Sequence, residues 1–192
     1  MCMVSAERPG SLMEALKARR SVRAYSDRGV GRGEVARLLE AAVLAPTAMH
    51  EEPWAFSVIQ DGALLKKISD RAKPLFVERL HRSGKIAQTF SDQAFDVFHG
   101  AGTLVVICAR ATSPFVEADC WLAAENLMLA ACDMGLGTCV IGSALPALDI
   151  PEIRAEAGIP PQYRPIAPVV VGYPQGETPA TSRKAPVILA WI

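Results

Sequence analysis

The spacing of hydrophobic positions changes along the chain and predicts a mixture of helices and strands. Apolar residues recur at helical spacing in five stretches, 12–19, 34–44, 61–68, 116–134 and 152–157. Short, mostly apolar runs bounded by turn residues predict strands at 54–59, 103–109 and 166–172. Because no linker or internal repeat divides the chain, we expect one layered domain of helices and strands over residues 1–192.

Two stretches are more apolar than an ordinary surface element. Nearly every position from 121 to 132 is apolar, so the helix at 116–134 has little room for a solvated face and is expected to be central or an interface. Gly135 is expected to end this helix. The chain ends in VILAWI, which should pack on its own sheet edge or on a partner subunit. Residues 74–102 have a mixed pattern, in which we also expect helices.

Composition narrows the class of protein. The 192 residues are 51% hydrophobic and 21% charged, which is typical of a globular domain and excludes a disordered chain. The 20 basic and 20 acidic residues balance, which argues against a dedicated nucleic-acid binder. No apolar run approaches the roughly 20 residues of a membrane span, and the first residues do not have the pattern of a signal peptide. Five cysteines without a CxxC pair favour reduced thiols, so we expect a soluble, cytoplasmic protein.

Basic residues concentrate in one segment, 17–37, which holds seven Lys or Arg and only two acidic residues. In an extended stretch Ser21 and Arg23 point to the same side, while Arg19 and Arg20 end the preceding helix. A hydroxyl beside several guanidinium groups is suited to binding phosphate. The alternative is a solvated basic face with surface ion pairs.

Other candidate motifs do not carry chemistry of their own. His50 lies beside two glutamates, but no second histidine or cysteine follows at metal-ligand spacing, so no metal site is expected. His81 and His99 are interpreted as ordinary helix residues, and the cysteines as structural. The glycines of 135–142 do not fit a dinucleotide fingerprint and favour close backbone approach instead. The residues alone therefore predict an α/β protein, dimeric if its apolar helix is an interface, that binds a phosphorylated small molecule.

Four segments together resemble the signatures of the nitroreductase family of FMN flavoproteins. They follow one another in the family's order along nearly the whole chain: RRSVRAY (19–25), APTAMHEEPWAF (45–56), AAENLMLAACDMGLGTCVIG (123–142), and VVVGYP (169–174) followed by Arg183 and Lys184. The resemblance implies an α+β sandwich with a central, mainly antiparallel sheet flanked by helices. It also implies an intertwined homodimer with two FMN molecules in the interface, in which the helix at 116–134 is the dimer core and the apolar tail is an arm on the partner.

The resemblance also implies which residues hold FMN. One subunit would bind the phosphate and ribityl chain with Arg19, Arg20, Ser21 and Arg23, joined at the phosphate by Arg183 and Lys184. Backbone groups of Ile141 and Gly142 would line the flavin. The partner subunit would reach it with Pro46, Thr47, Ala48, Met49 and His50, with Glu52 close behind.

The activity that the resemblance implies is an FMN-dependent, ping-pong oxidoreduction. NADH or NADPH would deliver hydride to flavin N5, and a nitroaromatic, quinone or other conjugated acceptor would then take it, so no protein nucleophile or metal is required. The alternatives are a flavin-dependent oxidase or dehalogenase with a dedicated substrate, and a flavin-binding dimer without turnover. A preference for NADPH would need a further cation at the pocket mouth, for which the candidates are Arg71, Lys73, Arg79, Arg82 and Lys85.

Two positions depart from the family pattern. His50 occupies the place of the signature Asn, and Glu52 that of the signature Gln. An ionised Glu52 near the ring can only accept hydrogen bonds and would lower the flavin's reduction potential, unless an arginine or His50 neutralises it. Alternatively, Glu52 faces elsewhere and caps backbone amides.

Overall fold

The computed structural model describes residues 10–82, 95–110 and 113–192, and its centre is one antiparallel sheet. The strand order is β1-β2-β4-β3, with bounds β1 (Trp54–Ile59), β2 (Thr103–Arg110), β3 (Gly137–Val140) and β4 (Tyr163–Gly172). The two central strands, β2 and β4, are buried on both faces because helices cover each side. The three strands predicted from the sequence are confirmed, and β3 is a fourth.

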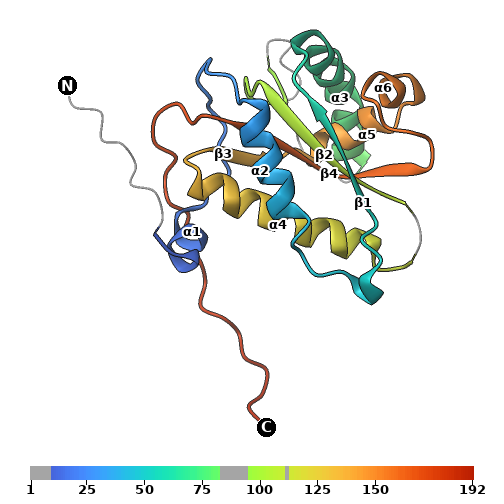
Figure 1. Cartoon of the computed structure of the whole chain (residues 1–192). Coiled ribbons are helices and arrows are strands. Elements are labelled where there is room, and N and C mark those ends of the chain that lie inside the picture. Colours follow the sequence, from blue (N-terminus) through green and yellow to red (C-terminus); the bar gives the residue numbers. More distant parts are fainter. Residues whose placement is uncertain (1–9, 83–94, 111–112) are drawn as a thin grey trace, which may run out of the picture.

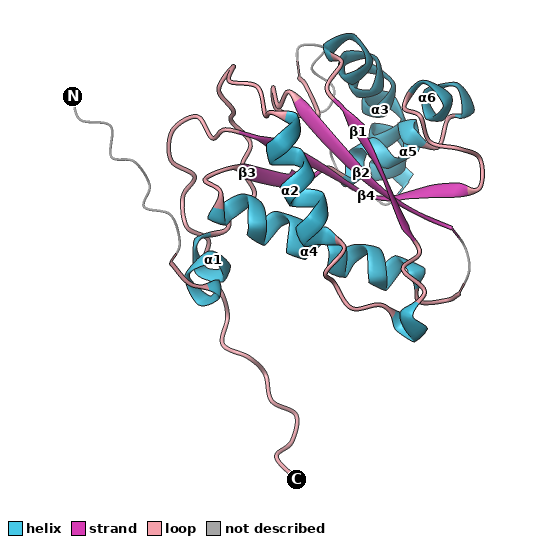
Figure 2. Cartoon of the chain, in the orientation of Figure 1, coloured by secondary structure: helices cyan, strands magenta, loops and turns pink. Residues whose placement is uncertain are grey.

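Helices cover both faces of this sheet (Figures 1 and 2). One face carries α2 (Arg32–Ala42) and α4 (Val116–Asp133), and the other carries α3 (Gly62–Arg82), α5 (Leu145–Leu148) and α6 (Pro151–Glu156). Side chains of β2 alternate between the two cores: Val105 and Ile107 pack with α4, whereas Leu104 and Val106 pack on the opposite side. The α+β sandwich with a mainly antiparallel sheet is confirmed.

Three short helices complete the described chain. Helix α1 (Leu12–Ala18) packs against α4, and Ser11 Oγ caps it by accepting from the Glu14 amide. Two short 3₁₀ helices, η1 (Ala48–His50) and η3 (Gly142–Ala144), follow α2 and β3 respectively. Each of them carries residues that the sequence singles out as flavin contacts.

Helix α3 is longer than the spacing of apolar residues predicts. The helix expected at 61–68 continues through Pro74 to Arg82, so part of the mixed region is helical. Residues 97–100, where a helix was also expected, form a turn instead. The rest of that expectation, over 83–94, lies outside the described residues. Among the described helices, none is long and apolar enough to cross a membrane.

The apolar helix α4 and the apolar tail both leave large side chains in contact with solvent. Gly135 ends α4 with a φ of 74°, as predicted, and Asn126 Nδ2 donates to the Ala41 carbonyl at 3.2 Å. Trp121 of α4 nevertheless remains 41% exposed, and Trp191 of the tail 89%. The tail runs past α1 and away from the body of the chain (Figure 1). It therefore does not pack on its own sheet, which was one of the two expectations for it.

The basic segment lies along the free edge of β3. Ser21 forms a single parallel bridge with Thr138, and Tyr25 an antiparallel bridge with Pro174. Glycines permit this contact: a Cβ added at Gly137 would lie 2.7 Å from Val22 Cγ2, and one at Gly172 would lie 2.6 Å from the Tyr25 ring. The interpretation of Gly137 as a position of close approach is thus confirmed.

Candidate functional site

A cationic cavity lies beside the bridged edge of β3. Its volume is about 530 Å³, and its polar wall consists of Arg23, Arg79 and His99. Residues 139–143 also line it, and the remaining lining is apolar: Phe76, Phe95, Val97 and Leu145. None of the described residues that line this cavity is acidic. A concave site with guanidinium groups and no carboxylate favours an anionic ligand.

The parallel bridge at Ser21 orients two of the expected phosphate ligands. Because side chains alternate along an extended chain, Ser21 and Arg23 project to the same side, beside the Cys139 thiol, which donates to the Val140 carbonyl at 3.7 Å. Burial raises the pKa of this thiol, while the guanidinium groups of Arg23 and Arg19 oppose that rise. A protonated, buried thiol is a poor nucleophile, so Cys139 has the structural role expected of it.

Arg19 and Arg20 line a neighbouring cavity rather than the first one. This second cavity, of about 330 Å³, is also lined by Cys132, Gly137 and Thr138. Arg19 Nε lies 3.6 Å from Glu125 Oε1 of α4, and Arg20 Nη1 donates to the carbonyls of Lys17 and Arg19 at the end of α1. Both arginines thus make local contacts as well, which agrees in part with the alternative of a basic face with ion pairs.

The turn that carries the expected partner contacts lies at the far end of α4. The Ala48 amide donates to Asp119 Oδ1 at 3.1 Å, and Asp119 is only 3% exposed. Met49, His50 and Glu52 all have positive φ, between 44° and 58°, and the Met49 side chain is exposed. Asp119 and Cys132 are separated by roughly 20 Å of helix at 1.5 Å per residue. In one chain the turn therefore lies at one end of α4, and the second cavity, which Cys132 lines, lies at the other.

The two residues that depart from the family pattern, His50 and Glu52, lie beside each other. His50 Nε2 lies 3.7 Å from Glu52 Oε1, and both side chains are largely exposed. The Glu52 amide donates to Thr47 Oγ1 at 3.4 Å. Among the described residues, the Glu52 carboxylate caps no backbone amide. His50 is thus the neighbour of Glu52 in this turn, and the position of Glu52 relative to a flavin stays a prediction.

The last two expected ligands, Arg183 and Lys184, lie on the exposed tail. Arg183 Nη1 donates to Thr181 Oγ1, two residues away, at 3.1 Å. Within the described part of the chain, no contact joins either residue to Ser21 or Arg23. Their role at a phosphate stays a prediction.

The structure adds two residues that sequence reasoning did not place in the site. Arg79 was considered only as a candidate for NADPH, and it comes from the part of α3 that follows Pro74. His99 was interpreted as a helix residue, which is wrong, because it lies in a turn with a φ of 56°. The signal was available in the sequence, since Asp96 and Gly100 flank it at turn spacing.

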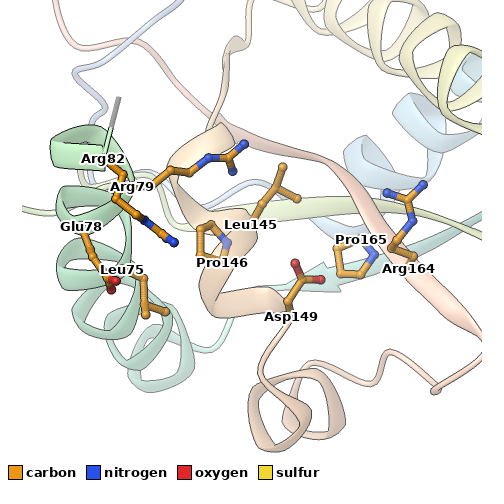
Figure 3. Close-up of a pocket in the computed structure, with 9 residues that line it drawn as sticks. All are labelled: Leu75, Glu78, Arg79, Arg82, Leu145, Pro146, Asp149, Arg164 and Pro165. Atoms are coloured by element: carbon orange, nitrogen blue, oxygen red, sulfur yellow. The ribbon is translucent and has the colours of Figure 1, made fainter. Parts of the chain in front are cut away.

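A larger and more open cavity adjoins the first, and Figure 3 shows its lining. Its volume is about 750 Å³, and Arg79 and Leu145 line both cavities. Side chains of α3 face the start of α5 and the first residues of β4 across it (Figure 3). Its charges are mixed, since Glu78 and Asp149 accompany Arg79, Arg82 and Arg164. Arg164 Nη2 lies 2.5 Å from Glu117 Oε1.

Fold and site together define a class of protein: an α+β sandwich whose four-stranded antiparallel sheet holds a cationic cavity at its edge. The model of the nitroreductase family matches residues 16–173, which is most of the chain. The chain belongs to the nitroreductase family, and by that membership it is an oxidoreductase of a flavoprotein family.

Individual relatives agree with this assignment. A protein from Archaeoglobus fulgidus, provisionally named NADH dehydrogenase/NAD(P)H nitroreductase, is 31% identical over 170 residues, which is 86% of each chain. The crystal structure of a nitroreductase with bound FMN from Bacteroides fragilis superimposes with a TM-score of 0.80 at 27% identity, covering 96% of this chain and 99% of that one. An iodotyrosine deiodinase from Thermotoga neapolitana is 23% identical and covers 92% of this chain and 96% of its own length.

Proposed function

We propose that this protein binds FMN and transfers hydride from NADH or NADPH, through the flavin, to a nitroaromatic, quinone or related conjugated acceptor. The observation that carries the proposal is the cationic cavity, because it unites three of the residues that the resemblance assigns to flavin. Arg23, Ile141 and Gly142 all line it, although over one hundred positions separate Arg23 from the other two.

The donors of the cavity suit FMN. Arg23 and Arg79 offer positive charge for a phosphate or an electron-rich ring. The amides of Gly142 and Ser143 begin η3, and a helix leaves its first amides without intrahelical acceptors. A Cβ added at Gly142 would meet nothing within 4 Å, so the backbone there is accessible to a flat ligand. Arg23 would therefore hold the phosphate and ribityl chain, and Ile141 and Gly142 would line the ring.

The bound cofactor supplies the hydride chemistry, and the chain supplies binding, orientation and exclusion of water. The apolar lining from Phe76, Phe95 and Val97 suits a flat aromatic ring. The adjoining cavity of Figure 3 offers a route by which a nicotinamide or an acceptor approaches, since Arg79 and Leu145 border both spaces.

The working form is a homodimer in this proposal. The turn at 46–52 cannot reach the cavity of its own chain along α4, but a second copy in antiparallel arrangement would bring its turn there. The exposed tail and the exposed Trp121 of α4 provide apolar area for such an interface. Arg183 and Lys184 on that tail would join the phosphate when the dimer forms.

Titration of the apoprotein with FMN tests the proposal. We expect Arg23→Ala to weaken FMN binding by at least about tenfold, because a charge-assisted hydrogen bond contributes roughly 1.5–3 kcal/mol. Arg71→Ala is the matched control, since Arg71 is an exposed arginine of α3 that lines none of these cavities. Equal FMN affinity in both variants would contradict the placement of the cofactor in this cavity.

One alternative has a specific observation in its favour, namely the relative named iodotyrosine deiodinase. A dehalogenase would use the same cofactor on a dedicated halogenated substrate. The reduced protein, offered a halogenated phenol and a nitroaromatic in separate anaerobic reactions, separates the two activities. Halide release with no nitro reduction would favour the dehalogenase.

A further inference from the structure

The turn at residues 96–100 is held rigidly from two sides. The Asp96 carboxylate accepts from the amides of Phe98 at 3.0 Å and Gly100 at 2.9 Å. Ser69 Oγ of α3 accepts from the Val97 amide at 3.1 Å. Val97 and Phe98 are each only 1% exposed. The backbone of this turn is therefore fixed by hydrogen bonds and by burial before any ligand binds.

His99 occupies an unfavourable backbone conformation within this fixed turn. Its φ is 56°, in the left-handed region that favours glycine, and Gly100 follows with 77°. A non-glycine residue stays in that region only where its surroundings hold it, and such residues gather at functional sites. Asp96 and Ser69 hold the backbone here, so the turn presents the His99 side chain in one direction.

That direction is into the cationic cavity, where the imidazole is half-buried. Its ring packs edge-to-face against Phe95, with 5.6 Å between centroids. It makes no hydrogen bond to any residue that the structure describes. A positioned imidazole without a partner, in the wall that also carries Arg23, Ile141 and Gly142, is available to a ligand.

The charged groups around His99 favour its neutral form. Arg23 of the N-terminal segment and Arg79 of α3 line the same cavity, Asp96 lies in its own turn, and Cys139 of β3 is a protonated thiol. Burial lowers the pKa of His99, Arg23 lowers it further, and Asp96 opposes both. At neutral pH the ring thus offers one N–H donor and one nitrogen acceptor.

We infer that His99 contacts the FMN bound in this cavity and helps to set its reduction potential. This inference rests on the proposed function. A donor aimed at the flavin stabilises the electron-rich reduced form more than the oxidised form, which raises the potential. Protonation of His99 in acid, below the ordinary range of a histidine, adds a positive charge there, so the potential should rise more steeply in that acid range than it does without the imidazole.

The test is the midpoint potential of bound FMN, measured by equilibration with reference dyes. His99→Gly removes the imidazole and keeps the left-handed backbone, so the fold should be retained with equal or higher thermal stability. We expect His99→Gly to lose tenfold in affinity for reduced FMN relative to oxidised FMN. This loss lowers the midpoint potential by about 30 mV for a two-electron couple. His99→Asn tolerates the same backbone and retains a donor, so its midpoint potential should lie between those of His99→Gly and the wild type. His81→Asn, at the exposed end of α3, is the control and should leave the midpoint potential unchanged.

The outcomes distinguish this inference from the proposed function. If the wild-type protein takes up no FMN, the proposed function fails and the inference fails with it. If the wild type binds and reduces FMN but His99→Gly has the same potential and the same dependence on pH, the inference alone is overturned. A change confined to thermal stability would show a structural role and would also overturn it.

Discussion

At the scale of single residues, one polar cluster fixes the segment that carries Arg23. The Arg28 guanidinium lies 3.8 Å from the centre of the Tyr173 ring, and the Tyr173 hydroxyl donates to the Glu34 carboxylate. The same carboxylate accepts from the Gly31 amide at 2.8 Å, which caps α2. The Ser26 amide donates to the Tyr173 carbonyl at 2.9 Å. Glu34 therefore links the helix cap, the end of β4 and the basic segment.

This cluster predicts how stability depends on pH. The hydrogen bonds from Tyr173 and Gly31 lower the pKa of Glu34 below its ordinary value of 4.5. Since the folded pKa lies below the unfolded one, this stabilisation is present above the ordinary pKa and is lost as the pH falls through the folded value. Glu34→Gln should lower the free energy of unfolding by about 1 kcal/mol at pH 7, the typical contribution of a helix cap.

Urea unfolding at pH 7 and pH 3 measures this effect. The difference between wild type and Glu34→Gln should shrink at pH 3, because this pH lies below the ordinary pKa of 4.5 and the stabilisation is lost as the pH falls from there through the folded value. Glu40→Gln, an exposed position of α2, should behave as wild type at both pH values. A difference of the same size at both pH values would mean that the charge of Glu34 contributes nothing.

A second prediction at this scale concerns Glu52. If its turn reaches the partner's flavin, the carboxylate disfavours a negatively charged reduced ring, and His50 at 3.7 Å offsets that only in part. Glu52→Gln should raise the midpoint potential of bound FMN by up to about 30 mV, a tenfold change for a two-electron couple. Glu51→Gln changes the same charge one residue away and serves for comparison. An unchanged potential in Glu52→Gln would place the carboxylate away from the ring.

At the scale of elements, the contact between the basic segment and β3 depends on a missing side chain. A Cβ at Gly137 would lie within 2.7–2.9 Å of three Val22 atoms, closer than real contacts allow. Gly137→Ala should cost about 1–3 kcal/mol in unfolding free energy, the usual effect of overpacking, and should weaken FMN binding by displacing Ser21 and Arg23.

A double-mutant cycle checks this contact. Val22→Ala removes two of the three clashing atoms, Cγ1 and Cγ2, and keeps Cβ at 2.9 Å, so the cost of Gly137→Ala should be smaller in that background but not zero. Gly33→Ala in α2 is the matched control, because its added Cβ meets nothing within 4 Å and alanine favours the helix. Strictly additive effects of Gly137→Ala and Val22→Ala would contradict the proposed clash.

The elements that sequence reasoning predicted are those with a strong local pattern. Val105, Val106 and Val170 lie in short apolar runs of branched residues, which are typical of buried strands, and Gly135 provides a standard helix end. The region after Pro74 was harder, because proline usually ends a helix and here does not. His99 was missed although Asp96 and Gly100 flank it at turn spacing, because the apolar residues around it favoured a helix. The bond that also holds this turn, from the Val97 amide to Ser69 Oγ, spans 28 positions and cannot be seen in a local pattern.

Only part of the candidate site was predicted from the sequence, because the rest depends on contacts between distant segments. The motif placed Arg19, Arg20, Ser21 and Arg23 together, but side chains alternate along an extended segment, so Arg23 faces one cavity and Arg20 another. The sequence could not separate the two cavities without the register of Ser21 against Thr138. The cation from α3, Arg79, was considered only as an NADPH contact.

At the scale of the whole molecule, the exposed apolar surface predicts self-association. The tail projects from the body of the chain (Figure 2), and Val187, Leu189 and Trp191 are each at least 87% exposed. Leu12 of α1 and Leu44 after α2 are also more than half exposed. Isolated chains rarely leave this much apolar surface in water, which favours a second copy as the occupant.

Truncation after Pro186 tests this arrangement. Removing VILAWI should raise the dimer dissociation constant by at least about tenfold, because burying one large apolar side chain contributes roughly 1.5–3 kcal/mol. Sedimentation equilibrium of the full chain and the truncated chain measures this, with Trp191→Ala as an intermediate variant. A full-length protein that sediments as a monomer would contradict the dimer.

We expect this chain to carry FMN and to exchange electrons with a nicotinamide and an acceptor. The visible spectrum of the full-length protein with FMN, recorded without oxygen before and after addition of NADH or NADPH, tests this. The flavin spectrum should bleach with at least one of the two nicotinamides and return when a quinone is added. A protein that takes up no FMN, or whose bound FMN stays oxidised with both nicotinamides, would contradict it.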